Sequence, residues 1–164
     1  MAYQDILYEK RDGIATITIN RPKVLNAFRA ETVEEMLEAM RDAEHDDEIG
    51  AVVLAGAGDR AFCSGGDNSA RASGSAEASG YGGRGLVGLP IEELHGAIRD
   101  SRKPVIAKVQ GYAIGGGNVL ATVCDLTIAS DKAVFGQVGP RVGSVDPGWG
   151  TAYLARHVGD KRAR

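Results

Sequence analysis

The first clear hydrophobic pattern is an alternation that is typical of a β-strand. In residues 13–20, Ala15, Ile17 and Ile19 alternate with threonines, which predicts a strand with one buried face. Residues 6–8 would pair with this strand as a hairpin. The run 51–54 is short and fully apolar, and the run 105–109 is short and apolar except for Lys108. We interpret them as strands buried on both faces, with a further strand at 126–129.

Helical spacing appears first in residues 30–43, where apolar side chains recur at i, i+3, i+4 and i+7. The positions concerned are Val33, Met36, Leu37 and Met40. Thr32 and Glu35 fit a capping box at the start of this helix. The segment therefore predicts an amphipathic helix that covers the buried face of the strands.

Three further helices are predicted by short apolar segments. Pro90 suits the first position of a helix that ends before Pro104, and 119–123 and 151–158 predict two more. Between the helices and strands, residues 68–88 and 136–150 are rich in glycine and are expected to be loops. Strands alternate with helices, so the sequence predicts one α/β domain over residues 1–164.

The composition supports an ordinary globular protein rather than one specialised for nucleic acids or membranes. The chain is 43% hydrophobic and 25% charged, with a formal net charge of -3. We find no basic stripe, no apolar run of membrane-spanning length and no signal peptide. Cys63 and Cys124 lie far apart, so neither a disulfide framework nor a metal site is expected. A cytoplasmic location is the expectation.

Two glycine-rich turns are the first candidates for chemistry: Ser64-Gly65-Gly66-Asp67 and Gly115-Gly116-Gly117. Glycine allows main-chain N–H groups to approach a ligand closely. A helix N-terminus leaves such groups unpaired and adds the positive end of the helix dipole. Each turn alone could be purely structural. If both pointed at one position, they would stabilise a developing oxyanion.

These turns belong to a longer set of motifs that resembles the crotonase (enoyl-CoA hydratase/isomerase) superfamily. The motifs are Asn20-Arg21-Pro22, Asn26-Ala27-Phe28, residues 61–67, 103–107 and 111–117, Cys124-Asp125-Leu126 and Phe135-Gly136-Gln137. The resemblance implies a spiral of ββα units that binds coenzyme A thioesters and stabilises an enolate. Coenzyme A would be part of the substrate, and no cofactor would be tightly bound.

The resemblance also implies roles for individual residues. The oxyanion donors would be the N–H groups of Gly66 and Gly116. Contacts with coenzyme A or the acyl group fall on Val24, Leu25, Ala27, Ser64, Gly65, Asp67, Asn68, Tyr81, Tyr112, Ile114 and Gly115.

Two positions depart from the hydratase pattern. Where that pattern has one glutamate after the triple-glycine turn and another after the Phe-Gly-Gln motif, this chain has Val119 and Gly139. Adding water across a double bond needs a placed acid and base, which these residues cannot supply. The sequence therefore argues against ordinary enoyl-CoA hydration.

Residues 135–150 resemble two subfamilies that make or break a carbon–carbon bond beside a thioester. One is 2-ketocyclohexanecarboxyl-CoA hydrolase, which opens a ring with water, and the other is dihydroxynaphthoyl-CoA synthase of menaquinone biosynthesis, which closes one. Val145, Pro147, Leu25 and residues 85–95 are more similar to the hydrolase. We therefore favour ring opening and aromatic degradation, and keep the synthase as the alternative.

The expected reactive side chains are Ser144 and Asp146, with Asp146 helping a water to attack the ring ketone. A second possibility is a bound bicarbonate at Gln137, Val138 and Gly139, since synthases with glycine at this last position use bicarbonate in place of a carboxylate. A non-catalytic acyl-CoA-binding protein is the competing class.

The last residues, 159–164, are expected to open another helix. The resemblance implies a C-terminal helical region beyond them, which covers the site and builds a homotrimer or hexamer. The chain is therefore expected to be a crotonase-like core that lacks that region.

Overall fold

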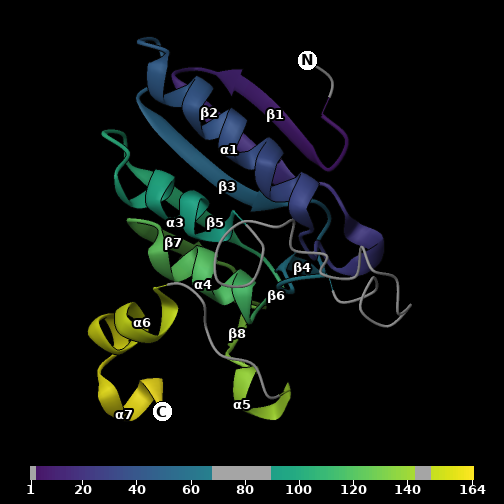
Figure 1. Cartoon of the computed structure of the whole chain (residues 1–164), viewed down its shortest axis with the longest axis vertical. Helices are drawn as coiled ribbons and strands as arrows, with labels where there is room; N and C mark the ends of the chain where they lie inside the picture. Colours follow the sequence, from purple (N-terminus) through teal and green to yellow (C-terminus); the bar gives the residue numbers. More distant parts are fainter. Residues whose placement is uncertain (1–2, 68–89, 143–148) are drawn as a thin grey trace.

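The computed structural model describes residues 3–67, 90–142 and 149–164. A five-stranded sheet has the order β1-β2-β3-β5-β7 (Figure 1). Its strands are β1 (Ile6–Arg11), β2 (Ile14–Ile19), β3 (Ala51–Gly56), β5 (Val105–Val109) and β7 (Leu126–Ala129). The pair β1–β2 is antiparallel and every later pair is parallel. This mixed α/β architecture confirms the predicted fold class.

The predicted hairpin is formed by β1 and β2, with Ile6 opposite Ile19. Asp12 and Gly13 make the turn with φ angles of 51° and 77°, the left-handed region that a two-residue hairpin loop requires. The predicted buried face is also confirmed, because Ala15 and Ile17 are completely buried.

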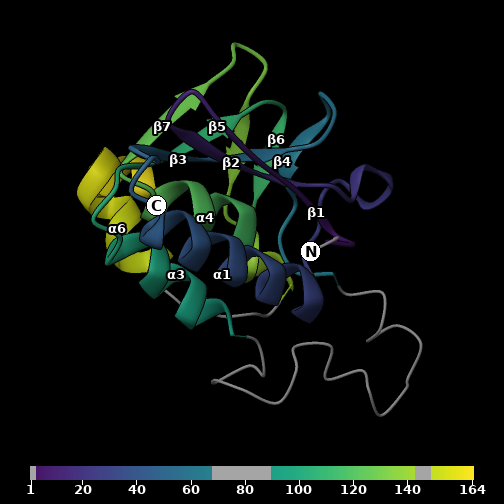
Figure 2. The same cartoon turned by 90° about the horizontal axis from the view of Figure 1, so that it is seen from above.

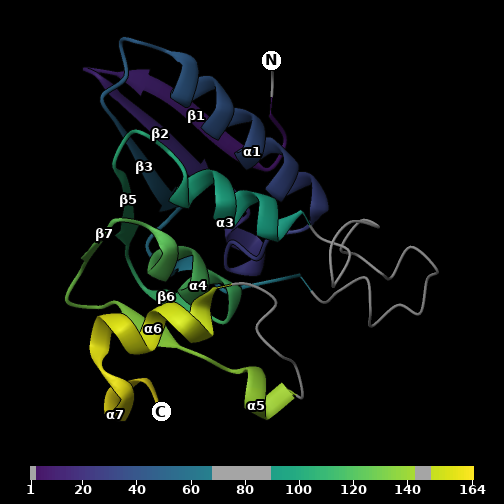
Figure 3. The same cartoon turned by 60° about the vertical axis from the view of Figure 1, so that its left-hand side comes forward.

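Helices cover one side of this sheet (Figure 2). They are α1 (Ala30–His45), α3 (Ile91–Arg99) and α4 (Gly116–Val123). Their apolar faces and the strands form a single core, which includes Met36 of α1, Leu94 of α3 and Leu120 of α4. Figure 3 shows α6 (Gly150–Val158) and α7 (Asp160–Ala163) beyond α4, on the side away from α1. The helix expected at 159–164 is thus present as α7.

The prediction that β3 and β5 are buried on both faces is wrong. Val53 of β3 and Ile106 of β5 are only partly buried, and Lys108 of β5 is exposed. The two strands alternate because the helices cover only one face of the sheet. The side chains on the uncovered face include β-branched residues, which are common in strands whether or not they are fully buried.

The capping box predicted with Thr32 at the N-cap and Glu35 three residues later is wrong, because Arg29 is the N-cap of α1 and Thr32 is the third residue of the helix. The hydroxyl of Thr32 accepts a hydrogen bond from the N–H of Arg29, the residue before α1, at 3.1 Å. Glu35 instead accepts from the N–H groups of three residues before and at the start of β1. These donors are Gln4 at 2.7 Å, Asp5 at 2.9 Å and Ile6 at 3.2 Å. The carboxylate of Glu35 therefore binds the N–H groups around the start of β1 and does not cap its own helix.

The segment 136–150 is not a continuous loop as predicted. Gly136 ends strand β8 (Val134–Gly136), and α5 (Gly139–Val142) follows it. Periodicity could not reveal an element of four residues that contains a glycine and a proline. Among the described residues, no helix has the length and apolar composition needed to cross a membrane.

A second, three-stranded parallel sheet positions the candidate site. Its order is β4-β6-β8, with β4 at Ala61–Cys63 and β6 at Tyr112–Ile114. Because β4 and β6 are parallel neighbours, their carboxyl ends lie at the same edge of the sheet. The two glycine-rich turns begin directly after these ends.

Candidate functional site

The two glycine-rich turns pack against each other. A Cβ atom placed on Gly65 would lie 3.1 Å from the main-chain nitrogen of Gly116 and 3.1 Å from the carbonyl oxygen of Ile114. Gly65 also has a φ of 96°, which strongly favours glycine. The absence of a side chain at Gly65 is therefore what allows the two turns to meet.

Gly66 is fixed by a short parallel bridge to Phe28. The N–H of Phe28 donates to the carbonyl of Gly65 at 2.9 Å, and the N–H of Asp67 donates to the carbonyl of Phe28 at 2.8 Å. Successive N–H groups of an extended segment point to opposite sides, so the N–H of Gly66 faces away from Phe28. Within the described ranges it donates to no other residue.

Gly116 is the first residue of α4 and follows Gly115, whose φ is 55°. The first hydrogen bond at this helix end runs from the N–H of Val119 to the carbonyl of Gly115, at 3.0 Å. The N–H of Gly116 is thus one of the groups that a helix leaves unpaired at its start. In the part of the chain described, it has no acceptor.

This arrangement can stabilise negative charge. Two main-chain donors come from adjacent turns, and one of them is at the positive end of a helix dipole. Hydrogen-bond donors held by the fold need no reorganisation when charge develops on a ligand oxygen. The assignment of Gly66 and Gly116 as oxyanion donors remains a prediction that this geometry supports.

The residues predicted to lie near coenzyme A come together beside the first turn. Ser64 donates its N–H to the carbonyl of Leu25 at 3.1 Å and its hydroxyl to the carbonyl of Val24 at 3.3 Å. Ala27 is buried, so its contribution is through the main chain. A hollow of about 120 Å³ lies next to Leu25; it is lined by Pro22, Leu25, Asn26 and residues 57–61.

The residues predicted to hold bicarbonate lie beside the second turn. The N–H of Gly115 donates to the carbonyl of Gly136 at 2.8 Å, which places the following residues next to α4. Val138 lies 3.6 Å from the position that a Cβ of Gly115 would take. The amide oxygen of Gln137 accepts a hydrogen bond from Asn118 at 3.3 Å.

Asn118 was missed by sequence reasoning. It is 5% exposed on α4, where Thr122 is the other polar residue. A polar residue within such an apolar segment was the available signal. Tyr112 and Ile114 point to the opposite side of β6 from the buried Ala113, and Tyr112 is exposed. Tyr112 therefore lies on the open side of the second sheet.

The two positions that depart from the hydratase pattern have no acid or base in the structure. Val119 is 3% exposed within α4, and Gly139 begins α5 without a side chain. Asp67 follows Gly66 directly, but its carboxylate is ion-paired with Arg21 at 2.9 Å. An ion-paired carboxylate is a poor proton acceptor.

The cysteines are not candidates for nucleophiles. Burial raises the pKa of Cys63 and of Cys124 to about 12, so both remain neutral thiols at physiological pH. In the described parts of the chain, no three His, Cys, Asp or Glu side chains are placed to hold a metal ion. Four predicted site residues, Asn68, Tyr81, Ser144 and Asp146, lie outside the described residues.

A family model described as enoyl-CoA hydratase/isomerase matches residues 9–164. The chain belongs to this family. Solved structures support the assignment over nearly the whole chain. An enoyl-CoA hydratase subunit I from Geobacillus kaustophilus is 31% identical over 98% of this chain and 60% of its own, with a TM-score of 0.83.

Two other members of the enoyl-CoA hydratase/isomerase family give the same result. An enoyl-CoA hydratase/isomerase (crotonase) from Legionella pneumophila is 32% identical over 99% of this chain and 61% of its own, with a TM-score of 0.83. An enoyl-CoA hydratase from Bacillus anthracis is 28% identical over 98% and 60%, with a TM-score of 0.85. The chain thus spans about 60% of the length of these structures.

Substitution of Gly65 tests whether the meeting of the two turns matters for family chemistry. We expect Gly65→Ala to lower turnover of an acyl-CoA substrate about 10²-fold, because the new Cβ would push against the nitrogen of Gly116. Gly159→Ala is the matched control, since Gly159 has a similar φ of 80° but no atom within 4 Å of the added Cβ. Equal losses in the two variants would show that backbone strain alone is responsible.

Proposed function

We propose that the protein is an acyl-CoA enzyme that opens a ring β-keto thioester with water, through an enolate held by the N–H groups of Gly66 and Gly116. The proposal rests on two features of the glycine turns. Two main-chain donors have no acceptor among the residues that the structure describes, and an apolar side chain, Val119, stands where hydration would need a carboxylate. The donors suit an enolate, and their surroundings do not suit hydration of a double bond.

The proposed reaction needs only water and the thioester. Water attacks the ring ketone, with Asp146 accepting its proton and Ser144 orienting the water or the ketone. The bond between the ketone carbon and the α-carbon then breaks, and its electron pair moves into the thioester as an enolate. The oxyanion lies between the two glycine N–H groups, and protonation of the α-carbon gives a dicarboxylic acyl-CoA.

Product analysis tests this proposal directly. The protein would be incubated with 2-ketocyclohexanecarboxyl-CoA, and the thioesters would be followed by mass spectrometry. We expect a product heavier than the substrate by one water, with the thioester intact. Binding of the substrate without any product would instead favour a non-catalytic acyl-CoA-binding protein, and a hydrated enoyl-CoA in a parallel incubation would favour ordinary hydratase activity.

The second candidate is a ring-closing condensation of the dihydroxynaphthoyl-CoA synthase type. It is favoured by the position of Gln137 and Val138 beside Gly115 and by the missing side chain at Gly139, because a bicarbonate bound there could act as the base. Coenzyme A would again be part of the substrate.

We expect the rate of this second reaction to depend on added bicarbonate. Assays in carbonate-free buffer would be compared with assays containing increasing bicarbonate, at constant ionic strength and pH. Chloride added to the same ionic strength is the control for general salt effects. A rate that is independent of bicarbonate would remove this site from the proposal.

A further inference from the structure

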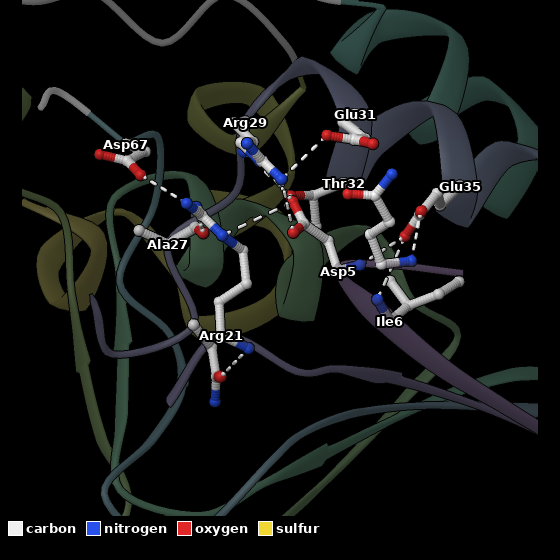
Figure 4. Close-up of polar contacts among 11 residues, drawn as sticks. Asp5, Ile6, Arg21, Ala27, Arg29, Glu31, Thr32, Glu35 and Asp67 are labelled. Atoms are coloured by element: carbon white, nitrogen blue, oxygen red, sulfur yellow. Dashed lines mark hydrogen bonds and ion pairs between the residues drawn. The ribbon is translucent and has the colours of Figure 1, made fainter. Parts of the chain in front are cut away.

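Arg21 connects the two segments that form the bridge at Gly66 (Figure 4). One guanidinium nitrogen, Nη1, donates to the carbonyl of Ala27 at 2.5 Å, and Nη2 lies 2.9 Å from a carboxylate oxygen of Asp67. The side chains of Arg21 and Asp67 are 16% and 12% exposed. The guanidinium thus holds one residue on each side of the Phe28–Gly66 bridge.

The guanidinium is itself held by the buried carboxylate of Asp5, the residue before β1. Asp5 lies 3.5 Å from Nε of Arg21 and 2.7 Å from Nε of Arg29, and it accepts a hydrogen bond from the hydroxyl of Thr32 at 2.6 Å. Burial of Asp5 favours its neutral form. The hydrogen bonds from Arg29 and Thr32 and the charge of Arg21 outweigh burial, so that the pKa of Asp5 is below its ordinary value.

Hydrogen bonds also hold the main chain of Arg21 in place. Its N–H donates to the side-chain oxygen of Asn26 at 3.1 Å, and its carbonyl accepts from the N–H of Asn26 at 2.9 Å. Asn26 is 1% exposed, and its amide donates to the carbonyls of Ala57 and Ala61. The base of the Arg21 side chain therefore has little freedom to move.

We propose that Arg21 is a positioning residue for the N–H of Gly66. The inference rests on the proposed role of that N–H in binding the thioester oxygen. The N–H of Gly66 belongs to the Gly65–Gly66 peptide, whose carbonyl accepts a hydrogen bond from the N–H of Phe28. The ion pair with Arg21 holds Asp67, the next residue, and so keeps the segment that contains this peptide aligned with Phe28. The bond to Ala27 fixes the partner segment against which Gly66 is aligned.

The planar fork of arginine is needed for this task. It directs Nη1 and Nη2 to two acceptors in different segments at once, whereas a lysine ammonium is a single flexible point of charge. The substitution Arg21→Lys should therefore keep the charge and lose the simultaneous contact. The substitution Asp67→Asn keeps the shape of the side chain and removes the ion pair.

Carbonyl polarisation gives a readout that a purely structural role would not change. The probe is cyclohexanecarboxyl-CoA labelled with ¹³C at the thioester carbonyl, which lacks the ring ketone and cannot be opened. Difference infrared spectra would record the carbonyl band of the bound probe, and isothermal titration would record its affinity. The matched control is Arg102→Lys, because Arg102 makes an ion pair with Glu44 at 2.7 Å on the far end of α1.

In the unaltered protein and in Arg102→Lys, we expect the carbonyl band to move to lower frequency on binding. In Arg21→Lys, most of this shift should be lost while affinity changes little, and in Asp67→Asn the shift should be lost to a similar extent. Where 2-ketocyclohexanecarboxyl-CoA is turned over, kcat should fall about tenfold or more at nearly unchanged KM.

Three results would overturn the inference. The full shift in folded Arg21→Lys and Asp67→Asn would show that the ion pair does not position the donor. Equal loss in Arg102→Lys would point to general destabilisation, and no shift in the unaltered protein would overturn the oxyanion donors as well. If Arg21→Lys does not fold, as judged by circular dichroism, Asp67→Asn decides the question. A full set of expected shifts without ring opening would refute the proposed reaction only.

Discussion

Asp146→Asn is expected to lower turnover of 2-ketocyclohexanecarboxyl-CoA about 10³-fold, because general-base catalysis contributes factors of this order. The described surroundings of the glycine turns strengthen this expectation. Val119 and Gly139 supply no carboxylate, and Asp67 is ion-paired with Arg21. The proposed base must therefore come from another residue, and the sequence indicates Asp146.

Affinity separates loss of the base from loss of the site. Dissociation constants for the unreactive cyclohexanecarboxyl-CoA should change little in Asp146→Asn, since the glycine donors are untouched. Asp131→Asn is the matched control, because Asp131 is exposed in the turn between β7 and β8. Unchanged turnover in Asp146→Asn would discard its role as the base.

Gly117→Ala is expected to destabilise the folded protein strongly. A Cβ atom at Gly117 would overlap the carbonyl oxygen of Cys63 and lie 2.6 Å from its carbonyl carbon. These are main-chain atoms of β4, so they cannot rotate away as a side chain could. We expect the free energy of unfolding to fall by about 3 kcal/mol, measured by urea denaturation monitored by circular dichroism.

Gly96→Ala is the control for adding a Cβ atom to a glycine within a helix, and it is expected to change stability in the opposite direction. A Cβ atom at Gly96, within α3, would have no neighbour within 4 Å. Alanine is favoured over glycine in helices, so this variant should be more stable by roughly 0.5–1 kcal/mol. If Gly117→Ala were as stable as Gly96→Ala, the close packing of α4 on β4 would be incorrect.

The sequence was sufficient for much of the fold because its local and tertiary preferences agree. The alternation in β2 and the helical spacing of Val33 and Met36 both correspond to buried faces. Glu35 shows the limit of such reasoning. Its spacing from Thr32 fits a capping box, but three N–H groups near β1 offer it better partners. No local pattern can reveal acceptors and donors that are 29–31 residues apart.

The candidate site also has a part that the sequence revealed and a part that it did not. The glycine turns were visible because glycine marks places where backbones come close, and the structure brings Gly65 against Gly116. The arrangement of Arg21 between Ala27 and Asp67 was not visible. It depends on a parallel bridge between residues 28 and 66, which only the packing of the loop before α1 against the turn after β4 creates.

Both candidate donors at this site belong to peptide groups, which has a consequence for how the site can be studied. Alanine scanning removes side chains, so it can displace these N–H groups but cannot delete them. Replacing the amide of Gly66 or Gly116 by an ester, through incorporation of glycolic acid, would replace the N–H group by an oxygen atom while leaving the shape nearly unchanged. Such an ester variant would measure separately how much each donor contributes to stabilising the oxyanion. No side-chain substitution in this chain can do so.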